Sequence, residues 1–390
     1  MIKIKKEKFI IILVSVALAA AALVVVAFAV HDQITGEVKV KRETYEEMAA
    51  VKNRYQKLYE LQEKVNAEGL YRTSESKQMD TMYHALVHSL NDPYSAYMTK
   101  EEAESWDDAV NMKYYGVGIS MEEEGRGNVV LQNVYDGTPA DAAGLKKGDR
   151  LLKVDGKSYH SVSGFRQAIR SREQTEVSIT YRRDGKDDTV KILRSELDSK
   201  SVYGGVLRGS KIGYIAILRF AEDTADDFRS ELDDLTDRGV KKVIIDLRGN
   251  GGGYMDQAVD VADQLLPEGT ITVTKNAEGK KKYYNSDETC TKMKYALLVN
   301  GDTASASEIL ASAVQDNHGG PVVGTKTYGK GVVQSEYHFG DGSGLRLTTM
   351  EYFSPKGREI NHRGITPDHV VNRGKGSSDP QLKAAEKLLS

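Results

Sequence analysis

Two residues in this chain could together support nucleophilic catalysis, and Ser305 is the candidate nucleophile. It follows an apolar segment and a turn of small and polar residues, Asn300–Ala304, and it precedes a stretch that predicts a helix. A serine at such a place would have an exposed hydroxyl, a helix amino terminus beside it and a free backbone N–H next to it. An ordinary helix cap occupies the same kind of position. Ser305 alone therefore leaves both interpretations open.

Lys330 is the second residue, and it lies between Gly329 and Gly331 in a segment that predicts a turn leading into a strand. A lysine there is most often a solvated charge. If it were buried beside Ser305, desolvation would lower its pKa, and the neutral amine could act as a general base. The pair could then support acyl transfer without a histidine.

A glycine-rich turn, residues 248–253, follows the apolar segment Val243–Leu247 and precedes a predicted helix. Backbone N–H groups in such a turn converge and can hold an anion or an oxyanion. A phosphate-binding loop looks similar, but the Gly-Lys-Ser/Thr that completes it is absent. The turn also lacks the serine between glycines that a trypsin-type protease needs.

Two further segments resemble the signatures of PDZ domains. The first is the Tyr-Gly-Val-Gly-Ile run, and the second is Gly137–Arg150, which contains two glycines, a proline and a Gly-Asp pair. In PDZ domains the first loop offers backbone N–H groups to a terminal carboxylate, and the neighbouring strand edge pairs with an extended peptide. A PDZ fold used only as a structural lid is the alternative. The residues that the resemblance assigns to tail binding are Tyr115, Gly116, Val117, Gly118 and Ile119.

Taken together, residues from about 70 to 371 resemble the carboxyl-terminal processing, or tail-specific, serine proteases. The resemblance covers the PDZ signature, the glycine-rich turn and four short motifs in the family's order. These motifs are Asp92-Pro93-Tyr94-Ser95, Ala304-Ser305-Ala306-Ser307-Glu308, Gly329-Lys330-Gly331 and Gly364-Ile365-Thr366-Pro367-Asp368. One departure is Thr303, where serine is common in the family; it lies outside the catalytic pair.

This resemblance implies a catalytic role for each of five positions. Ser305 would be the nucleophile and Lys330 the general base. Gln334 matches the position that orients the lysine, and in a strand it would share a face with Lys330. The backbone N–H groups of Ala306 and Gly252 would form the oxyanion hole. The expected function is a serine endopeptidase that cuts proteins at or near their carboxyl termini. A non-catalytic tail-binding scaffold is the rival.

The amino terminus contains a basic segment followed by an apolar one. Four lysines within the first eight residues precede an apolar stretch, residues 9–30, which is broken only by Ser15. As a helix it would be ~33 Å long, enough to cross a bilayer, and the lysines would keep the amino terminus in the cytoplasm. A cleaved signal peptide is the alternative, since Ala27–Ala29 resembles a cleavage site. Both interpretations place residues 31–390 outside the cytoplasm, on a single-pass anchor or released.

The pattern of elements predicts an α/β and α+β multidomain fold. After the anchor or signal (1–30), helical periodicity at 44–67 and 75–90 indicates a helical arm whose apolar stripe could pair with a second copy in a homodimer. Short β-type runs separated by glycines indicate the PDZ domain, and alternating strands and helices indicate a parallel-rich α/β protease core. The expected parts are 1–30, 31–113 (arm), 114–195 (PDZ), 196–375 (core) and 376–390 (C-terminal helix or tail).

Composition excludes other classes of function. The chain has 54 basic and 57 acidic residues, a net charge of −3, which gives no reason to expect nucleic acid as a partner. The single cysteine, Cys290, cannot form an internal disulfide or a cysteine-rich zinc site. No spacing indicates a metal site, and the expected chemistry needs no cofactor. The predicted partners are protein substrates and, through residues 9–30, a membrane.

Overall fold

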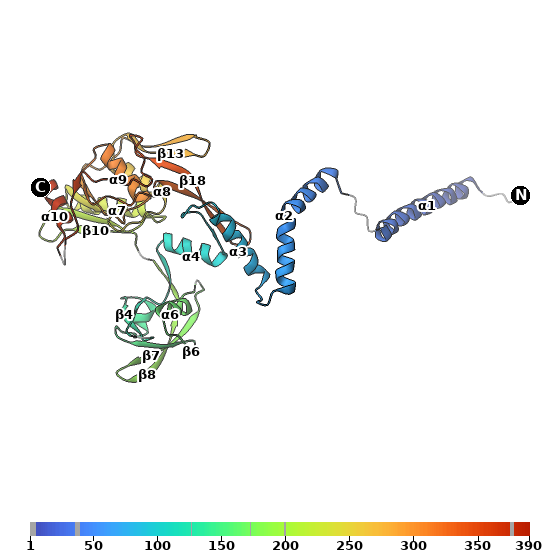
Figure 1. Cartoon of the computed structure of the whole chain (residues 1–390), viewed down its shortest axis with the longest axis horizontal. Coiled ribbons are helices and arrows are strands. Elements are labelled where there is room, and N and C mark those ends of the chain that lie inside the picture. Colours follow the sequence, from blue (N-terminus) through green and yellow to red (C-terminus); the bar gives the residue numbers. More distant parts are fainter. Residues whose placement is uncertain (1–4, 36–39, 126, 172, 199, 375–377) are drawn as a thin grey trace. The chain divides into compact units, whose positions relative to one another are not determined.

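The computed structural model describes most of the chain (Figure 1). The described residues are 5–35, 40–125, 127–171, 173–198, 200–374 and 378–390, with the side chains of 24–35, 114 and 198 excluded. Contacts divide the chain into two units, Met1–Gln78 and Met79–Ser390. Each unit is considered by itself.

The first unit is helical. It contains α1 (Lys6–Thr35), α2 (Arg42–Glu68) and the start of α3 (Glu75–His88). The helices predicted at 44–67 and 75–90 are confirmed to within two residues at each end. Within the described part of the chain, no helix is both long and apolar enough to cross a membrane. The span expected at 9–30 is therefore not supported, and its side chains beyond residue 23 lie outside the described residues.

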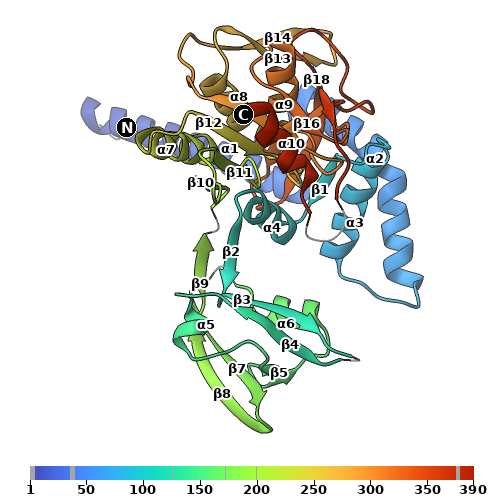
Figure 2. The same cartoon turned by 90° about the vertical axis from the view of Figure 1, so that its left-hand side faces the viewer.

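A β-rich module forms the first part of the second unit. The paired strands β2 and β9 lead the chain into and out of it (Figure 2). Its sheet has the order β3-β4-β5-β7-β8, with β6 beside β5, and Phe165 and Val177 are fully buried in its core. The bounds are α4 (Lys100–Val110), β2 (Lys113–Gly116), β3 (Ile119–Glu123), β4 (Val129–Val134), α5 (Pro139–Ala142), β5 (Arg150–Val154), β6 (Lys157–Ser158), α6 (Val162–Ile169), β7 (Glu176–Arg183), β8 (Lys186–Leu193) and β9 (Ser195–Asp198).

The main sheet of the second unit has the order β10-β11-β12-β15-β16-β19. All neighbouring pairs from β11 onward are parallel, and β10 is antiparallel. This confirms the parallel-rich α/β core. The bounds are β10 (Val202–Val206), β11 (Gly213–Ile217), α7 (Thr224–Asp237), β12 (Lys242–Asp246), α8 (Met255–Leu265), β15 (Lys294–Val299), α9 (Ala306–Asp316), β16 (Val322–Gly324), β19 (His369–Val370) and α10 (Pro380–Leu389).

Helices cover both faces of this sheet. Successive side chains of β12 point to opposite faces and pack against different helices. Val243 and Ile245 pack in the cluster that includes residues of α7, α8 and α9. Ile244, which points the opposite way, packs with Ala385 and Leu389 of α10. Because both faces are covered, the strand reads as a continuous apolar run in the sequence.

A second, antiparallel sheet completes the core. Its order is β1-β18-β13-β14, with β17 also paired to β18. The bounds are β1 (Ala96–Met98), β13 (Gly269–Asn276), β14 (Lys281–Ser286), β17 (Val332–His338) and β18 (Gly344–Phe353). Periodicity alone did not indicate β13 and β14. β17, which follows Lys330 in the sequence, pairs with β18 in this sheet.

Candidate active site

Ser305 occupies the turn between β15 and α9. Its backbone has φ 57° and ψ −120°, a region that is unfavourable for a residue with a side chain. Such strain is of order 1–3 kcal/mol and persists where the surrounding structure dictates it. The side chain is half-exposed, and α9 begins at the next residue. The local geometry is therefore a strained strand-to-helix turn with a half-exposed serine, the kind of turn that presents the nucleophile in α/β-hydrolases.

The carboxylate of Glu308 holds this turn. It is fully buried and accepts four hydrogen bonds: from the Ser305 N–H at 2.9 Å, the Thr327 hydroxyl at 2.5 Å, the Gly329 N–H at 2.8 Å and the Lys330 N–H at 2.9 Å. Burial raises the pKa of Glu308, while these hydrogen bonds act in the opposite direction. One side chain thus binds the backbone of both Ser305 and Lys330.

Tyr352, in β18, joins the same two residues from another direction. Its buried hydroxyl lies 2.9 Å from the Ser305 carbonyl oxygen and 2.6 Å from that of Lys330. The single hydroxyl proton is shared between two acceptors. Two segments that are 25 residues apart in sequence are therefore tied together at their backbones by Glu308 and Tyr352.

The amine of Lys330 is half-buried, and its pKa is lowered to about 8. Desolvation is the largest cause, and the positive charge of Arg346 comes second. Its Nζ lies 4.7 Å from the centre of the Tyr94 ring. Within the described part of the chain, no hydrogen bond joins this amine to the Ser305 hydroxyl. A substantial fraction of the amine is neutral near pH 8, as a general base requires.

Gln334 lies in β17, whereas Lys330 precedes that strand. The pairing register of β17 with β18 shifts between Val333 and Gln334. That Lys330 and Gln334 share a face stays a prediction. The Gln334 amide donates to the Thr348 hydroxyl at 3.0 Å. Its carbonyl oxygen is the group that could still accept a hydrogen bond from an ammonium.

The glycine-rich turn lies against the serine. A Cβ atom on Gly252 would lie 2.8 Å from the Cβ of Ser305 and 3.1 Å from the nitrogen of Ala306, so only glycine fits. The Gly252 N–H donates to Asn250 Oδ1 at 2.9 Å. This hydrogen bond already occupies the donor that was expected in the oxyanion hole. The Ala306 N–H, in contrast, has no acceptor among the described residues.

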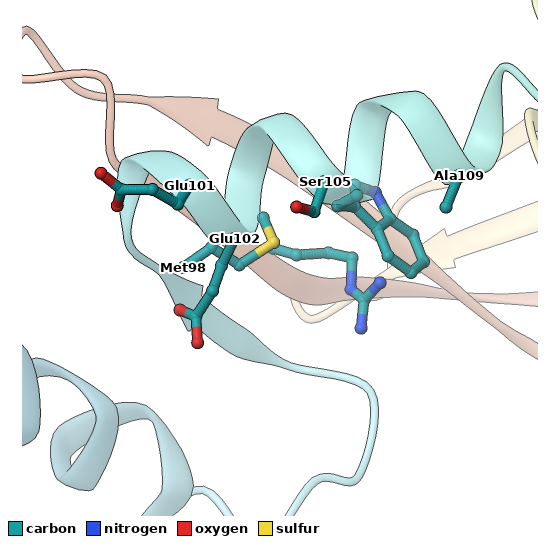
Figure 3. Close-up of a pocket in the computed structure, with 7 residues that line it drawn as sticks. Met98, Glu101, Glu102, Ser105 and Ala109 are labelled. Atoms are coloured by element: carbon teal, nitrogen blue, oxygen red, sulfur yellow. The ribbon is translucent and has the colours of Figure 1, made fainter. Parts of the chain in front are cut away.

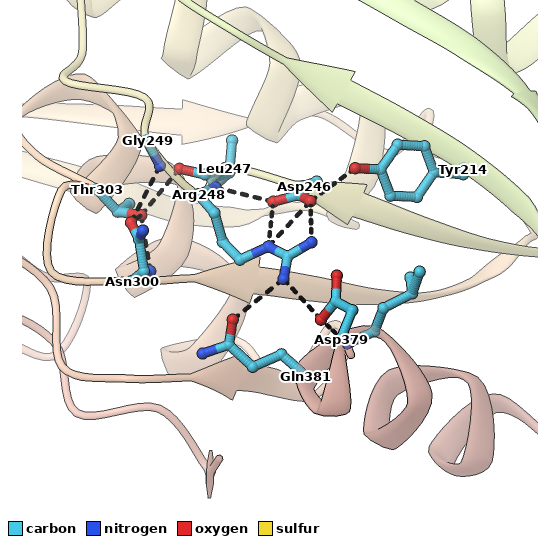
Figure 4. Close-up of polar contacts among 10 residues, drawn as sticks. Tyr214, Asp246, Leu247, Arg248, Gly249, Asn300, Thr303, Asp379 and Gln381 are labelled. Carbon is cyan, nitrogen blue, oxygen red and sulfur yellow. Dashed lines mark hydrogen bonds and ion pairs between the residues drawn. The ribbon is translucent and has the colours of Figure 1, made fainter. Parts of the chain in front are cut away.

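Hydrogen bonds fix the two turns to one another (Figure 4). The buried Thr303 hydroxyl donates to the Leu247 carbonyl at 2.8 Å, and the Gly249 N–H donates to Asn300 Oδ1 at 3.0 Å. Thr303, the position that departs from the family pattern, thus performs a structural role that either hydroxyl residue could perform.

Arg248 anchors the start of the glycine-rich turn (Figure 4). Its guanidinium pairs with Asp246 at 2.6 Å and with Asp379, at the start of α10, at 2.9 Å. Gln381 accepts a further hydrogen bond from Arg248, and Tyr214 donates to Asp246 at 2.7 Å. The carboxyl-terminal helix is therefore connected by side chains to the turn beside Ser305.

The predicted tail-binding residues, Tyr115–Ile119, lie at the junction of β2 and β3. Gly118 has φ +86°, and a Cβ there would lie 2.2 Å from Thr138, so the loop requires glycine. Among the described residues, β3 pairs only with β4, which leaves its other edge without a strand partner. That edge is available for an added strand.

Three residues near the dyad were given no role by sequence reasoning: Glu308, Tyr352 and Arg346. Glu308 stands in the Ala-Ser-Ala-Ser-Glu motif, and its spacing of three from Ser305 matches a capping box, which was a usable signal. Tyr352 and Arg346 come from β18 and are brought to the site only by sheet pairing. No local pattern could have indicated them.

Comparison with known proteins agrees with this geometry. Residues 211–371 match peptidase family S41, and residues 116–193 match the PDZ domain. The chain is 31% identical over 384 residues to the "Probable CtpA-like serine protease" of Staphylococcus aureus (strain N315), covering 97% of this chain and 75% of the relative. It is 30% identical over 357 residues to the "Carboxy-terminal processing protease CtpA" of Bacillus subtilis (strain 168), covering 86% and 76%.

The fold is also similar to a solved structure of a Bacteroides fragilis NCTC 9343 protein classed with the S41 proteases. The TM-score is 0.53 at 17% sequence identity, over 78% of this chain and 89% of that chain. The chain belongs to the carboxyl-terminal processing proteases of peptidase family S41, carries a PDZ domain, and is a serine-type peptidase.

Proposed function

We propose that this peptidase cuts protein substrates at or near their carboxyl termini with Ser305 as nucleophile and Lys330 as general base. The observation that carries the proposal is the double connection between these residues, through Glu308 and through Tyr352. The lowered pKa of Lys330 supports the same assignment, since a lysine base must be neutral to accept a proton.

The reaction would proceed by acyl transfer. The neutral Lys330 amine takes the Ser305 hydroxyl proton as Oγ attacks the scissile carbonyl carbon, and the resulting ammonium protonates the departing amine. The tetrahedral oxyanion would accept a hydrogen bond from the Ala306 N–H, which also stands at the positive end of α9. The acyl-enzyme is then hydrolysed by water that Lys330 deprotonates.

Gln334 and Gly252 take supporting roles in this proposal. The Gln334 carbonyl oxygen would accept a hydrogen bond from the Lys330 ammonium, while its amide group stays bonded to Thr348. Gly252 leaves space for the oxyanion beside Ala306. Its own N–H could contribute only by sharing its hydrogen bond with Asn250.

The PDZ domain would capture the substrate tail. The loop at Tyr115–Ile119 offers backbone N–H groups to the terminal carboxylate, and the open edge of β3 accepts the preceding residues as an added strand. Recognition of a carboxylate would restrict binding to chain ends, which explains cleavage near the terminus.

We expect Ser305→Ala to abolish cleavage of an internally quenched peptide with an apolar, free carboxyl tail, while the variant still binds that peptide. The methyl side chain removes the nucleophile and leaves the PDZ domain unchanged. Turnover and fluorescence anisotropy measure the two effects. The same peptide with a carboxamide terminus should bind at least about tenfold more weakly, because it lacks the charge.

A non-catalytic tail-binding scaffold predicts a different pattern. It would bind the free-acid peptide without any cleavage by the parent chain. Cleavage that persists in Ser305→Ala would instead contradict the assigned nucleophile. Equal binding of the acid and the amide would contradict carboxylate recognition.

We infer that residues 31–390 act outside the cytoplasm. The support is the order of charges at the amino terminus, with Lys3, Lys5, Lys6 and Lys8 before the apolar stretch at 9–30. Cell fractionation with a tag after Ser390 tests this. Recovery of the tag only in the cytoplasmic fraction would contradict it, and extraction at high pH separates an anchored from a released form.

We also infer that α2 mediates homodimerisation. None of its residues is buried, and it presents large apolar side chains at helical spacing, including Met48, Val51, Tyr55 and Leu58. A second copy of the same stripe would cover them. Sedimentation should show a dimer for residues 31–390 and a monomer for residues 71–390, and a monomer in both would refute the inference.

A further inference from the structure

A short turn, Asp92–Ser95, covers the side chain of Lys330 and is held in place by its own hydrogen bonds. Asp92 accepts the Tyr94 N–H at 3.1 Å and the Ser95 hydroxyl at 2.5 Å. The Ser95 oxygen then accepts the Thr348 N–H of β18 at 3.0 Å. The turn is thus attached to the strand next to β17, and it presents Tyr94 to the lysine.

Tyr94 contacts two cations with two different groups. The Nζ of Lys330 lies 4.7 Å from the centre of its ring, and the Nε–H of Arg346 donates to its carbonyl oxygen at 3.1 Å. Burial and the neighbouring Tyr328 phenol raise the pKa of the Tyr94 hydroxyl. The backbone of Tyr94 is therefore held by Arg346, and its ring faces the Lys330 amine.

Arg346 is itself held firmly. Its guanidinium carbon lies 3.8 Å from the centre of the Trp106 ring of α4, and the indole N–H of Trp106 donates to Glu336 at 2.8 Å. Figure 3 shows the groove that this stack forms between α4 and β18. The groove lining includes neither Ser305 nor Lys330. It is formed by Met98, Glu101, Glu102, Ser105, Trp106, Ala109 and Arg346.

We propose that Tyr94 is a positioning residue of the reaction, whose ring holds the protonated amine of Lys330 beside Ser305 until that amine loses its proton. The proposal rests on Lys330 being the general base. An aromatic face attracts an ammonium and has no comparable attraction for a neutral amine. Loss of the proton therefore frees Nζ to approach the serine hydroxyl.

Groups around the Lys330 amine shift its pKa in opposite directions, and the Tyr94 ring is one of these groups. Desolvation and the charges of Arg346 and Arg219 favour the neutral amine, whereas the charges of Asp92 and Glu308 favour the ammonium. The Tyr94 ring also favours the ammonium. Removing its attraction should therefore move the pH at which the enzyme becomes active downward.

The test replaces residue 94 in the full-length chain with isosteric rings of decreasing electron density: Tyr94→Phe, then mono-, di- and trifluorinated phenylalanine at the same position. The probe is the internally quenched peptide, and the readout is the acid limb of kcat/KM against pH. We expect the pH midpoint of this acid limb to be nearly the same in Tyr94→Phe and in the parent. Across the fluorinated series the midpoint should fall by about half a pH unit to one pH unit.

Tyr94→Leu removes the ring and extends the series. Its acid limb should also move to lower pH, and its plateau kcat should fall about tenfold because the ammonium that forms during acyl transfer is no longer held in place to protonate the departing amine. Tyr284→Leu is the matched control, because Tyr284 makes the same kind of contact with Lys282 at 4.4 Å, in β14. This control should leave both the limb and the plateau unchanged.

The outcomes separate the two claims. If Lys330→Ala is inactive but the acid limb stays constant across the fluorinated series, the role of Tyr94 is refuted and the proposed base survives. If Lys330→Ala retains activity, the proposed function itself fails. A limb that moves to higher pH with fluorination would also overturn the proposal, since its sign would be wrong.

Discussion

Lys330→Met is expected to lower kcat/KM by roughly four orders of magnitude at pH 8 while leaving the fold intact. Methionine matches the apolar length of lysine but cannot accept a proton. Lys330→Arg should be equally inactive, because a guanidinium is not deprotonated in this pH range. Lys326→Met is the matched control, since Lys326 is an exposed lysine four residues earlier in the same segment.

The parent enzyme should show the corresponding pH dependence. Its kcat/KM should rise through about pH 8, the pKa to which desolvation and Arg346 lower the Lys330 amine. A profile that is flat between pH 6 and 9, or a Lys330→Met variant that retains activity, would contradict the assignment of the base. Stopped assays with the same peptide across this range provide the measurement.

The same pKa shift predicts the effect of Lys330→Met on stability. The Lys330 amine has a pKa of about 8 in the folded state and 10.5 in the unfolded chain. Below pH 8 the amine is protonated in both states, so the folded state carries the full free-energy penalty of a buried charge. This penalty disappears as the pH rises from 8 to 10.5. Lys330→Met should therefore be more stable than the parent at pH 7 by roughly 1–3 kcal/mol, a difference that chemical denaturation can resolve.

Glu308→Gln is expected to lower kcat by roughly 10²- to 10³-fold and to destabilise the fold by about 2–4 kcal/mol. The carboxylate accepts four hydrogen bonds at a buried position. An amide has one acceptor oxygen, and its NH2 group would face backbone N–H donors. The Ser305 and Lys330 backbones would then separate, and the strained φ of Ser305 would relax.

Two measurements distinguish lost positioning from simple unfolding. The activity of Glu308→Gln should be determined at a temperature well below its own Tm, where circular dichroism shows the fold intact. Glu351→Gln, the same change at an exposed position of β18, should alter neither property. Full activity of a folded Glu308→Gln variant would show that Glu308 does not position the dyad.

Much of the fold was predictable because its signals are local. The helices at 44–67 and 75–90 and the apolar segment Val243–Leu247 were each indicated by a short run of residues with consistent spacing. The glycines at 118 and 252 were likewise meaningful in the sequence, because a positive φ or a close backbone approach can be met by glycine alone. The register shift between β17 and β18 after Val333, in contrast, had no signal in the sequence.

By itself the sequence determined the identities of Ser305 and Lys330, the turn of glycines beside the serine and the family to which these motifs belong. It left each residue chemically ambiguous, because a serine before a helix and a lysine between glycines are ordinary features. Only the tertiary structure decided the pKa of Lys330, since the desolvation of its amine and the nearby charge of Arg346 depend on strands that are distant along the chain. Likewise, the roles proposed for Glu308, Tyr352 and Tyr94 rest on hydrogen bonds and ring contacts made across elements.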